Sequence, residues 1–344
     1  MKFESRSLYL KKRFPLRISR GEIAGGENLF VSVTEGGLTG WGEMAPGASE
    51  GAATVAEGAA QLQAFCEGGL SWAIHDIWDA ARKAGVGACA LAALDMALWD
   101  LRAKQAGMPL YRLLGLARRG VVSSLTVGIN PPEVVRERVP LLLARGARAL
   151  KIKLGSTDGI EADKAMFAAV VEAAAGSGAA LRVDANGGWS LEEAREMMGW
   201  LAARGAEYVE QPLVHGAEDQ LPALFKDRAL PVFVDESCRF SSDIPSFASC
   251  VDGVNLKLMK CGGITEALRI VATARAFGLK TMIGCMGESS VSIAAGASLS
   301  ALFDYIDLDS HLNLDPDPAA GAPFDDGITL PADRPGHGGT LRHA

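Results

Sequence analysis

The chain has 344 residues, of which 49% are apolar and 22% charged, and its formal net charge is −7. This length predicts about two domains, and this composition predicts a globular protein with a large core. The acidic balance without a basic run argues against nucleic-acid binding. The N-terminus lacks the apolar segment of a secretion signal, and the longest apolar stretches are too short to cross a bilayer. We therefore expect a cytoplasmic protein without a membrane or nucleic-acid partner.

The cysteines give no sign of a metal site or a disulfide framework. There are six, and none forms a Cys-x-x-Cys pair. This spacing makes a zinc ribbon improbable, and the absence of a secretion signal favours the reduced state. We expect mostly buried thiols.

Residues 1–120 predict an α+β domain. The segments FVSV (30–33) and LTGWGE (38–43) flank a Glu-Gly-Gly turn, which is typical of a β-hairpin. Residues 50–115 have helical patterns, and ACALAALDMALWDLRAKQ (88–105) is apolar on nearly every face, which indicates a buried helix. Gly107 and Pro109 end this helix.

Residues 121–310 predict a parallel barrel. Most of its short apolar runs are separated by a helical stretch, the clearest of which begins with a capping box at Ser190 and Glu193. Alternating strands and helices predict a parallel sheet, and eight such strands predict a closed barrel. Residues 311–344 read as irregular chain that returns to the N-terminal domain. The runs are SLTVGI (124–129), ALKIKLG (149–155), LRVDAN (181–186), EYVEQP (207–212), VFVDES (232–237), VNLKLM (254–259), KTMIGC (280–285) and YIDLDS (305–310).

Three carboxylates end consecutive predicted strands. Asp184, Glu210 and Asp235 should converge, because the active site of such a barrel lies at the carboxyl ends of its strands. Converging carboxylates repel one another unless a cation holds them, and oxygen ligands without His or Cys favour Mg²⁺. A single acid could simply cap its own loop, but three in series favour a metal site.

Two lysines lie on the strands to either side of these acids. Lys153 and Lys257 should face each other across the metal, with Lys151 adding a like charge beside Lys153. A nearby cation lowers the pKa of a lysine and suits it to act as a general base. Two opposed bases over one metal favour a 1,1-proton transfer, in which one base removes an α-proton and the other returns a proton to the opposite face. For Lys260 we expect a salt bridge to a metal-site acid.

The order of these motifs resembles a known family. LKIKLG, VDANGGW, VEQPL, VDES, LKLMKCGG and IGCMGES, preceded by WGE, are similar to the motifs of the enolase superfamily, muconate lactonizing enzyme subgroup. The resemblance covers nearly the whole chain. It implies a modified TIM barrel, (β/α)₇β, under an α+β capping domain formed by the N- and C-terminal segments. It also implies Mg²⁺ ligands at Asp184, Glu210 and Asp235 and acid–base roles for Lys153 and Lys257.

Within that family, IDLDS resembles the Asp-x-Asp element of dipeptide epimerases, including L-Ala-D/L-Glu epimerases. There the pair holds the substrate's free α-ammonium, and Asp307 and Asp309 would share one face of the last strand. The other reading is that both are solvated loop acids. We also assign Lys151 to substrate binding. The seventh strand carries no histidine, which counts against the dehydratases of the superfamily.

Specificity is expected from a capping loop, FPLRISRGEIAGGEN (14–28). Arg17 or Arg20 could pair with an acidic substrate side chain, although either could equally be a surface arginine. Glu22 and Glu27 could instead favour a basic side chain, so the sequence leaves the preference open. Glu288 receives no definite role.

We therefore predict a homo-oligomeric, Mg²⁺-dependent dipeptide epimerase that transfers a proton at the α-carbon of the C-terminal residue. The alternatives are an o-succinylbenzoate synthase or N-succinylamino acid racemase, and a muconate-type cycloisomerase. A non-catalytic barrel that binds a small anion or peptide is a further possibility. The two opposed lysines argue against that last reading, since a binding protein has no need of them.

Overall fold

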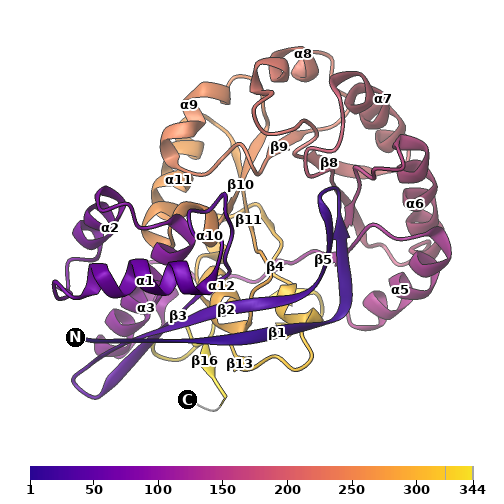
Figure 1. The fold of residues 1–344 in the computed structure, drawn as a ribbon. Helices are drawn as coiled ribbons and strands as arrows, with labels where there is room; N and C mark the ends of the chain where they lie inside the picture. The colour runs from indigo at the N-terminus through magenta and orange to yellow at the C-terminus, as the bar shows by residue number, and fades with distance from the viewer. Residues whose placement is uncertain (322, 343–344) are drawn as a thin grey trace.

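A long antiparallel hairpin dominates the N-terminal part of the computed structural model, which describes residues 1–321 and 323–342. Strands β1 (Lys2–Ile18) and β2 (Gly21–Glu35) pair along most of their length, and β3 (Leu38–Met44) pairs with β2 as the sequence predicts. The expectation of a loop over residues 14–28 is wrong, because this segment forms the ends of β1 and β2. Figure 1 shows the tip of the hairpin rising over the barrel.

Helices pack closely on this sheet through its glycines. A Cβ atom at Gly40 would lie 2.0 Å from the Ala97 carbonyl oxygen, and one at Gly42 would lie 1.9 Å from that of Ala93. The glycines of LTGWGE therefore let β3 approach the buried helix α3 more closely than any side chain would allow. The helices of this part are α1 (Val55–Cys66), α2 (Ile74–Lys83), α3 (Ala88–Gln105) and α4 (Leu110–Leu113).

The central part of the described chain is a (β/α)₇β barrel, as the sequence predicts. Eight parallel strands lie in chain order, and helices surround them on the outside (Figure 1). A bridge between Ser123 and Ile306 closes the barrel, with the Ser124 N–H donating to the Ile306 carbonyl at 2.9 Å. The strands are β5 (Leu125–Val127), β6 (Ala149–Lys153), β7 (Ala180–Asp184), β8 (Ala206–Glu210), β9 (Val232–Val234), β10 (Gly253–Lys257), β11 (Lys280–Gly284) and β12 (Tyr305–Ile306).

Each of the first seven strands is followed by a helix that packs outside the barrel, and the short α10 (Leu258–Cys261) precedes α11. The capping box at Ser190 and Glu193 is present at the start of α7. No helix in the described part of the chain is long and apolar enough to cross a membrane. The seven helices are α5 (Pro132–Ala144), α6 (Ile160–Ala173), α7 (Leu191–Ala202), α8 (Leu221–Phe225), α9 (Ile244–Phe247), α11 (Ile264–Ala276) and α12 (Ser290–Ala297).

The C-terminal segment packs against the N-terminal elements. Strands β13 (Ala319–Ala320) and β16 (Thr340–Leu341) pair with each other, and β14 (Phe324–Asp325), β15 (Ile328–Thr329) and β4 (Val121–Val122) form a small sheet. The buried His337 donates from Nε2 to the Trp41 carbonyl at 2.8 Å, and its backbone N–H donates to Asp100. The domain limits 1–120, 121–310 and 311–344 remain a prediction.

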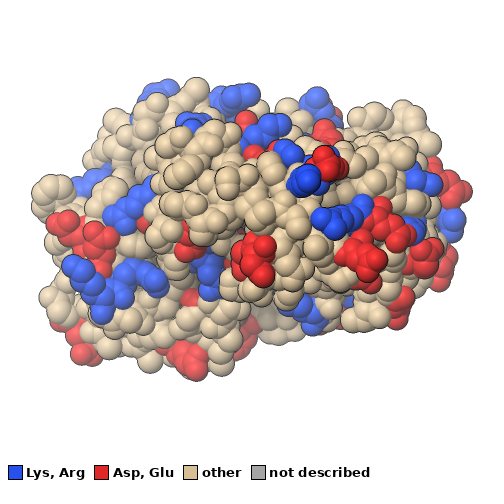
Figure 2. Space-filling view, turned by 90° about the horizontal axis from the view of Figure 1, so that it is seen from above, with Lys and Arg blue, Asp and Glu red and all other residues tan. Residues whose placement is uncertain are grey.

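Buried hydrogen bonds join the N-terminal part to the barrel. The Glu43 carboxylate, in the WGE motif, accepts from Asn28 Nδ2 at 2.8 Å and from the Ser289 N–H and hydroxyl at the start of α12. Because Glu43 is fully buried, these donors compensate for the loss of its hydration. On the face shown in Figure 2, basic and acidic side chains form small groups among uncharged ones, and several of these groups of opposite charge lie side by side.

Candidate active site

Three carboxylates meet at the carboxyl ends of three adjacent strands. Asp184 ends β7, Glu210 ends β8, and Asp235 directly follows β9. Their ligand oxygens lie within 4.8 Å of one another, and all three side chains are buried. The strand-end spacing in the sequence thus brings these acids together as expected.

The backbone around Asp184 explains the VDANGGW motif. The Asn186 N–H donates to Asp184 Oδ1 at 2.9 Å, and Asn186 itself has a positive φ of 45°. A Cβ atom at Gly188 would lie 2.5 Å from the Cα of Gly155, in the loop after β6. Only a glycine allows the two loops to approach this closely. The tight turn therefore fixes the orientation of the Asp184 carboxylate.

Two amide side chains make hydrogen bonds that position Glu210 and Asp235. The Gln211 side-chain oxygen accepts from the Asp235 N–H at 2.8 Å, and Asn255 Nδ2 donates to Glu210 Oε1 at 2.7 Å. All four residues are buried, so these hydrogen bonds act in a low-dielectric environment, where they are strong. Gln211 and Asn255 are positioning residues that the sequence reading missed, although Gln211 lies in the VEQPL motif.

Lys153 and Lys257 flank the acids from opposite sides. Lys153 ends β6, and its Nζ lies 2.5 Å from Asp184 Oδ2. Lys257 ends β10, and its Nζ lies 2.8 Å from Asp235 Oδ2. Because β7, β8 and β9 lie between β6 and β10 in the sheet, the two ammonium groups approach the acids from either side. This is the arrangement that two opposed bases require.

Lys151 lies on β6 with Lys153 but is buried more deeply. Its side chain is fully buried, and it is not among the residues that line the cavity. Its Nζ lies 2.6 Å from Asp307, 2.8 Å from Glu210 and 3.2 Å from Asp184. Three carboxylates thus surround its ammonium, and the assignment of Lys151 to substrate binding stays a prediction. Lys151 links the acid triad to the last strand.

Lys260 makes the salt bridge that the sequence analysis preferred. Its Nζ contacts the Asp235 carboxylate and donates to the carbonyl oxygens of Cys238 and Asn255, each at 3.0 Å. The side chain is buried and is not among the cavity-lining residues. Lys260 therefore neutralises Asp235 from behind and is not a candidate base.

The charges of the triad fit a divalent cation. Burial would raise the pKa of Asp184 and of Asp235, but neighbouring lysines outweigh burial and hold both pKa values below the usual range. Burial and the negative charge of Asp184 raise the pKa of Glu210 to about 8. A bound cation would favour the ionised form of Glu210. Three buried carboxylate oxygens at this separation form a ligand set that suits Mg²⁺.

Asp307 and Asp309 both reach the cavity from the end of β12. One oxygen of Asp307 contacts Lys151, and the other has no hydrogen-bond partner among the described residues. Asp309 Oδ2 accepts from the Thr126 N–H at 2.6 Å, and burial together with the charge of Asp307 raises the pKa of Asp309 to about 6. Asp307 is buried, so the reading of a solvated loop acid does not hold for it.

The tip of the β1–β2 hairpin is anchored on the barrel. Arg20 Nη2 lies 2.8 Å from Glu236, and both Arg20 and Ser19 donate to the Asn186 carbonyl, at 3.1 and 3.0 Å. Arg17 lies outside the set of cavity-lining residues and only approaches Asp158, at 3.9 Å. Of the two arginines considered for substrate binding, the structure therefore brings only Arg20 to the cavity, and its guanidinium is already paired.

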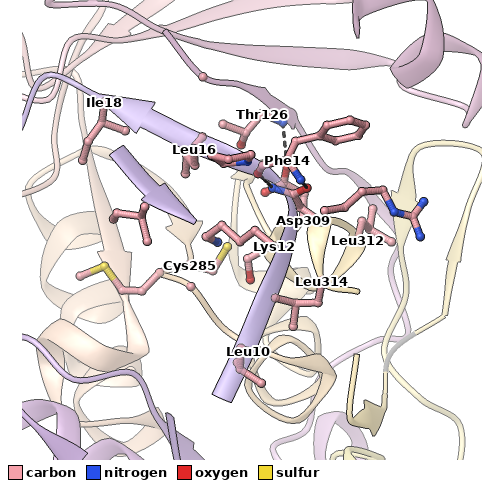
Figure 3. Close-up of a pocket in the computed structure, with 18 of the residues that line it drawn as sticks. Leu10, Lys12, Phe14, Leu16, Ile18, Thr126, Cys285, Asp309, Leu312 and Leu314 are labelled. Atoms are coloured by element: carbon pink, nitrogen blue, oxygen red, sulfur yellow. Dashed lines mark hydrogen bonds between the residues drawn. The ribbon is translucent and has the colours of Figure 1, made fainter. Parts of the chain in front are cut away.

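The hairpin, the barrel mouth and the C-terminal segment enclose a cavity of about 670 Å³. Lys153, Lys257, Asp307 and Asp309 lie on its barrel side. Figure 3 shows the hairpin side chains that point into it, and most are apolar. A substrate with apolar side chains would fill this space. The apolar lining residues include Leu10, Phe14, Leu16, Ile18, Ile23, Leu125, Val127, Leu142, Met286, Leu312 and Leu314.

Comparison with known proteins identifies the family. Residues 6–115 match the N-terminal domain of mandelate racemase / muconate lactonizing enzyme, and residues 134–344 match the enolase C-terminal domain-like model. The chain belongs to the mandelate racemase / muconate lactonizing enzyme family. The resemblance inferred from the sequence motifs is therefore confirmed, as is the barrel-and-cap fold.

Members of this family with dipeptide epimerase names are close relatives. A hydrophobic dipeptide epimerase from Roseobacter litoralis is 79% identical over the whole of both chains. The L-Ala-D/L-Glu epimerase of Bacillus subtilis, solved as a substrate-liganded complex, has a TM-score of 0.93, 29% identity and 98% coverage of both chains. The dipeptide epimerase of Enterococcus faecalis V583, solved with Mg and L-Leu-L-Tyr, has a TM-score of 0.92, 32% identity and coverage of 98% of this chain and 99% of that one.

Two buried ionisable residues of this family member were missed or left without a role. Lys12, on β1, lines the cavity and is only 7% exposed. Glu288 follows β11 and accepts from the Met286 N–H at 2.7 Å, and burial raises its pKa to about 8. The Lys-Lys pair at 11 and 12 reads as a solvated strand, so the sequence offers no signal that Lys12 is buried.

Proposed function

We propose that this protein is a Mg²⁺-dependent epimerase of dipeptides with apolar side chains, and that it inverts the α-carbon of the C-terminal residue. The observation that carries the proposal is the pair of opposed lysines. Lys153 and Lys257 reach one cavity from β6 and β10, on either side of a buried acid triad. A 1,1-proton transfer needs a base on each face of the α-carbon, and a binding protein needs neither.

Asp184, Glu210 and Asp235 would hold the metal ion. When bound, Mg²⁺ supplies positive charge that favours ionisation of the substrate α-carbon next to its carboxylate. Lys153 and Lys257 then each hold or accept a proton on one face of that carbon. Their ion pairs with Asp184 and Asp235 keep both side chains aimed at the triad. Relatives solved with Mg and a dipeptide support this assignment.

The other end of the substrate is bound by charge. Asp307 has a free buried oxygen, and Asp309 adds a second carboxylate beside it, so the pair suits an α-ammonium group. An ammonium held at β12 and a carboxylate held at β7 to β9 set the length of the substrate between them. The apolar lining of the cavity then favours apolar side chains. The name of the Roseobacter relative, hydrophobic dipeptide epimerase, agrees with this preference.

N-succinylamino acid racemisation would use the same two lysines. It would not use Asp307 and Asp309 as an ammonium site, because an N-acylated substrate has no ammonium there. The acidic pair therefore favours a free dipeptide. The cytoplasmic location, the homo-oligomeric state and the absence of a nucleic-acid partner are proposals that rest on the sequence.

The direct test is solvent exchange at the α-carbon. The protein is incubated with Mg²⁺ and L-Leu-L-Leu in D₂O, and proton NMR follows loss of the α-proton signal and appearance of L-Leu-D-Leu. N-acetyl-L-leucine and N-succinyl-L-leucine serve as competing substrates. Exchange confined to the second residue of the free dipeptide is expected. Faster turnover of the N-succinyl compound would instead support the racemase alternative.

A further inference from the structure

Among the described charged residues that line the cavity and that the proposed function does not use, only Lys12 is buried. Five β1 residues at every second position line the cavity together with Arg13 and Pro15, and Figure 3 labels the five: Leu10, Lys12, Phe14, Leu16 and Ile18. Four of these five side chains are apolar. Lys12 is more than nine-tenths buried, whereas Arg13, which also lines the cavity from β1, is exposed.

The Lys12 ammonium has no partner in the described part of the chain. It makes no hydrogen bond and no ion pair within 4.0 Å. The two acids whose charge acts on Lys12 accept hydrogen bonds from other groups, Asp309 from the Thr126 N–H and Glu288 from the Met286 N–H. Burial lowers the pKa of Lys12, and Cys285, Asp309 and Glu288 offset this only in part. A buried ammonium without a counter-charge is costly, which marks this position as a binding site.

The position of Lys12 relative to the substrate follows from the strand order. Its backbone is bridged to Leu314, which fixes it on the C-terminal segment. A Cβ atom at Gly287 would lie 3.6 Å from Lys12 Nζ, so the ammonium lies over the loop that follows β11. The neighbouring strand is β12, which carries Asp307 and Asp309, whereas the acid triad lies on β7 to β9. In the proposed substrate orientation, this position lies nearer to the amino end of the dipeptide than to its carboxylate.

We infer that Lys12 can bind the side-chain carboxylate of the first substrate residue, so that the enzyme accepts, besides apolar dipeptides, dipeptides with an acidic first residue and an apolar second residue, and discriminates against a basic first residue. This inference rests on the proposed function, because it uses the substrate orientation set by Asp307 and the acid triad. The side chain of the first residue is attached to the α-carbon that carries the ammonium, so it is the substrate group closest to Lys12. The second side chain lies beyond, at the carbon between Lys153 and Lys257.

The test compares kcat/KM, from α-proton exchange in D₂O with Mg²⁺, for four dipeptides that share a second residue: L-Glu-L-Leu, L-Gln-L-Leu, L-Leu-L-Leu and L-Lys-L-Leu. Lys12→Met should lower kcat/KM for L-Glu-L-Leu on the order of tenfold or more, the effect of losing a charge-assisted hydrogen bond. The same variant should leave L-Leu-L-Leu nearly unchanged. Lys12→Glu should reverse the order of L-Glu-L-Leu and L-Lys-L-Leu.

Lys11→Met is the matched control, because Lys11 is the adjacent, exposed residue of the same strand and the substitution removes the same charge. It should not change the order of the four substrates. An equal loss for all four dipeptides in Lys12→Met would overturn the inference, since it would place Lys12 on a shared group or in a structural role. An unchanged ratio of L-Glu-L-Leu to L-Gln-L-Leu would overturn it as well. Absence of exchange with any dipeptide in the unmodified protein would instead overturn the proposed function itself.

Discussion

Lys151 and Asp307 form a buried ion pair of 2.6 Å that joins the two ends of the proposed substrate site. The same ammonium contacts Glu210 and Asp184 of the acid triad. A change in the charge of Asp307 therefore alters the electrostatic environment of Glu210 and Asp184, and the reverse also holds. The proposed ammonium site and the proposed metal site are parts of one electrostatic network.

Removing Lys151 should damage both stability and activity. In Lys151→Met, three buried carboxylates lose their shared counter-charge, and breaking a buried ion pair in this way costs about 3–5 kcal/mol. Urea unfolding without added metal should show this loss, and exchange activity should fall even where the variant is folded. Lys2→Met, which breaks the exposed pair with Glu4, should change neither. A Lys151→Met variant as stable as the parent would contradict the network.

The acid triad should be needed for metal binding as well as for turnover. Asp184→Asn, Glu210→Gln and Asp235→Asn each remove one negative charge from a set of three, so Mg²⁺ affinity and activity should both fall by orders of magnitude. Calorimetric titration of Mg²⁺ measures the first effect and D₂O exchange the second. Glu192→Gln, an exposed change on α7, serves as the control. Full activity in EDTA would be incompatible with a metal-dependent reaction.

Each lysine should act on one epimer. Lys153 and Lys257 reach the cavity from opposite strands, so each can take a proton from only one face of the α-carbon. Lys153→Ala should lose exchange with one of L-Leu-L-Leu and L-Leu-D-Leu, and Lys257→Ala should lose exchange with the other. Proton NMR in D₂O measures the two rates separately. Equal residual exchange of both epimers in either variant would argue against two opposed bases.

The predictable part of this molecule is the part set by strand periodicity. Eight apolar runs with intervening helices specify the barrel, and the barrel brings strand-end residues such as Asp184 and Lys257 together whatever lies between them. The spacing of Lys151 and Lys153 correctly gives a shared strand face. The spacing does not predict how deeply each side chain lies along the barrel axis. That depth is the difference between Lys151, which carboxylates enclose, and Lys153, which lines the cavity.

The hairpin over residues 14–28 could not be predicted from local pattern. Its glycines and proline read as a loop, and the pairing of β1 with β2 shifts register between Lys11 and Leu16. Tertiary hydrogen bonds hold the hairpin in place. Arg20 donates to the Asn186 carbonyl, and the Ile129 N–H donates to the Arg17 carbonyl. Such contacts join residues more than a hundred positions apart, so no sequence window contains them. The burial of Lys12 depends on the same hairpin.

Substrate binding should weaken in acid. Asp309 has a pKa of about 6, raised by burial and by Asp307, so it is ionised above pH 6 and protonated below it. Only the ionised form attracts an ammonium group. The KM of L-Leu-L-Leu should therefore rise about tenfold for each pH unit well below 6. Asp309→Asn should have a high KM that no longer depends on pH in this range. A flat profile in the unmodified protein would exclude Asp309 from ammonium binding.

N-acetylation of the substrate should strongly lower kcat/KM. Acetyl-L-Leu-L-Leu lacks the ammonium that Asp307 and Asp309 are proposed to bind, and it places an uncharged amide against two carboxylates. Its kcat/KM should be lower than that of L-Leu-L-Leu by orders of magnitude, and Asp307→Asn should largely erase the difference between the two. Equal turnover of both compounds by the unmodified protein would contradict the ammonium site.

Glu288 should make the protein less stable as the pH rises. Burial raises its pKa from 4.5 to about 8, so the folded state retains a proton that the unfolded state has already lost. The contribution of Glu288 to the free energy of unfolding therefore falls as the pH rises from 4.5 to 8 and then levels off. A shift of this size corresponds to a loss of a few kcal/mol, on the order of 1.4 per pH unit.

Glu288→Gln removes this titration and keeps an acceptor for the Met286 N–H. The variant should therefore gain stability relative to the parent as the pH rises, with a small difference at pH 5 and the largest difference at pH 8 and above. Urea unfolding at pH 5, 6.5, 8 and 9, with and without Mg²⁺, measures the difference. Glu192→Gln should show no such trend, since Glu192 is exposed on α7. A difference that shrinks toward high pH would mean that Glu288 is ionised in the folded protein and paired with a nearby cation, for which Lys257 and Lys12 are the candidates.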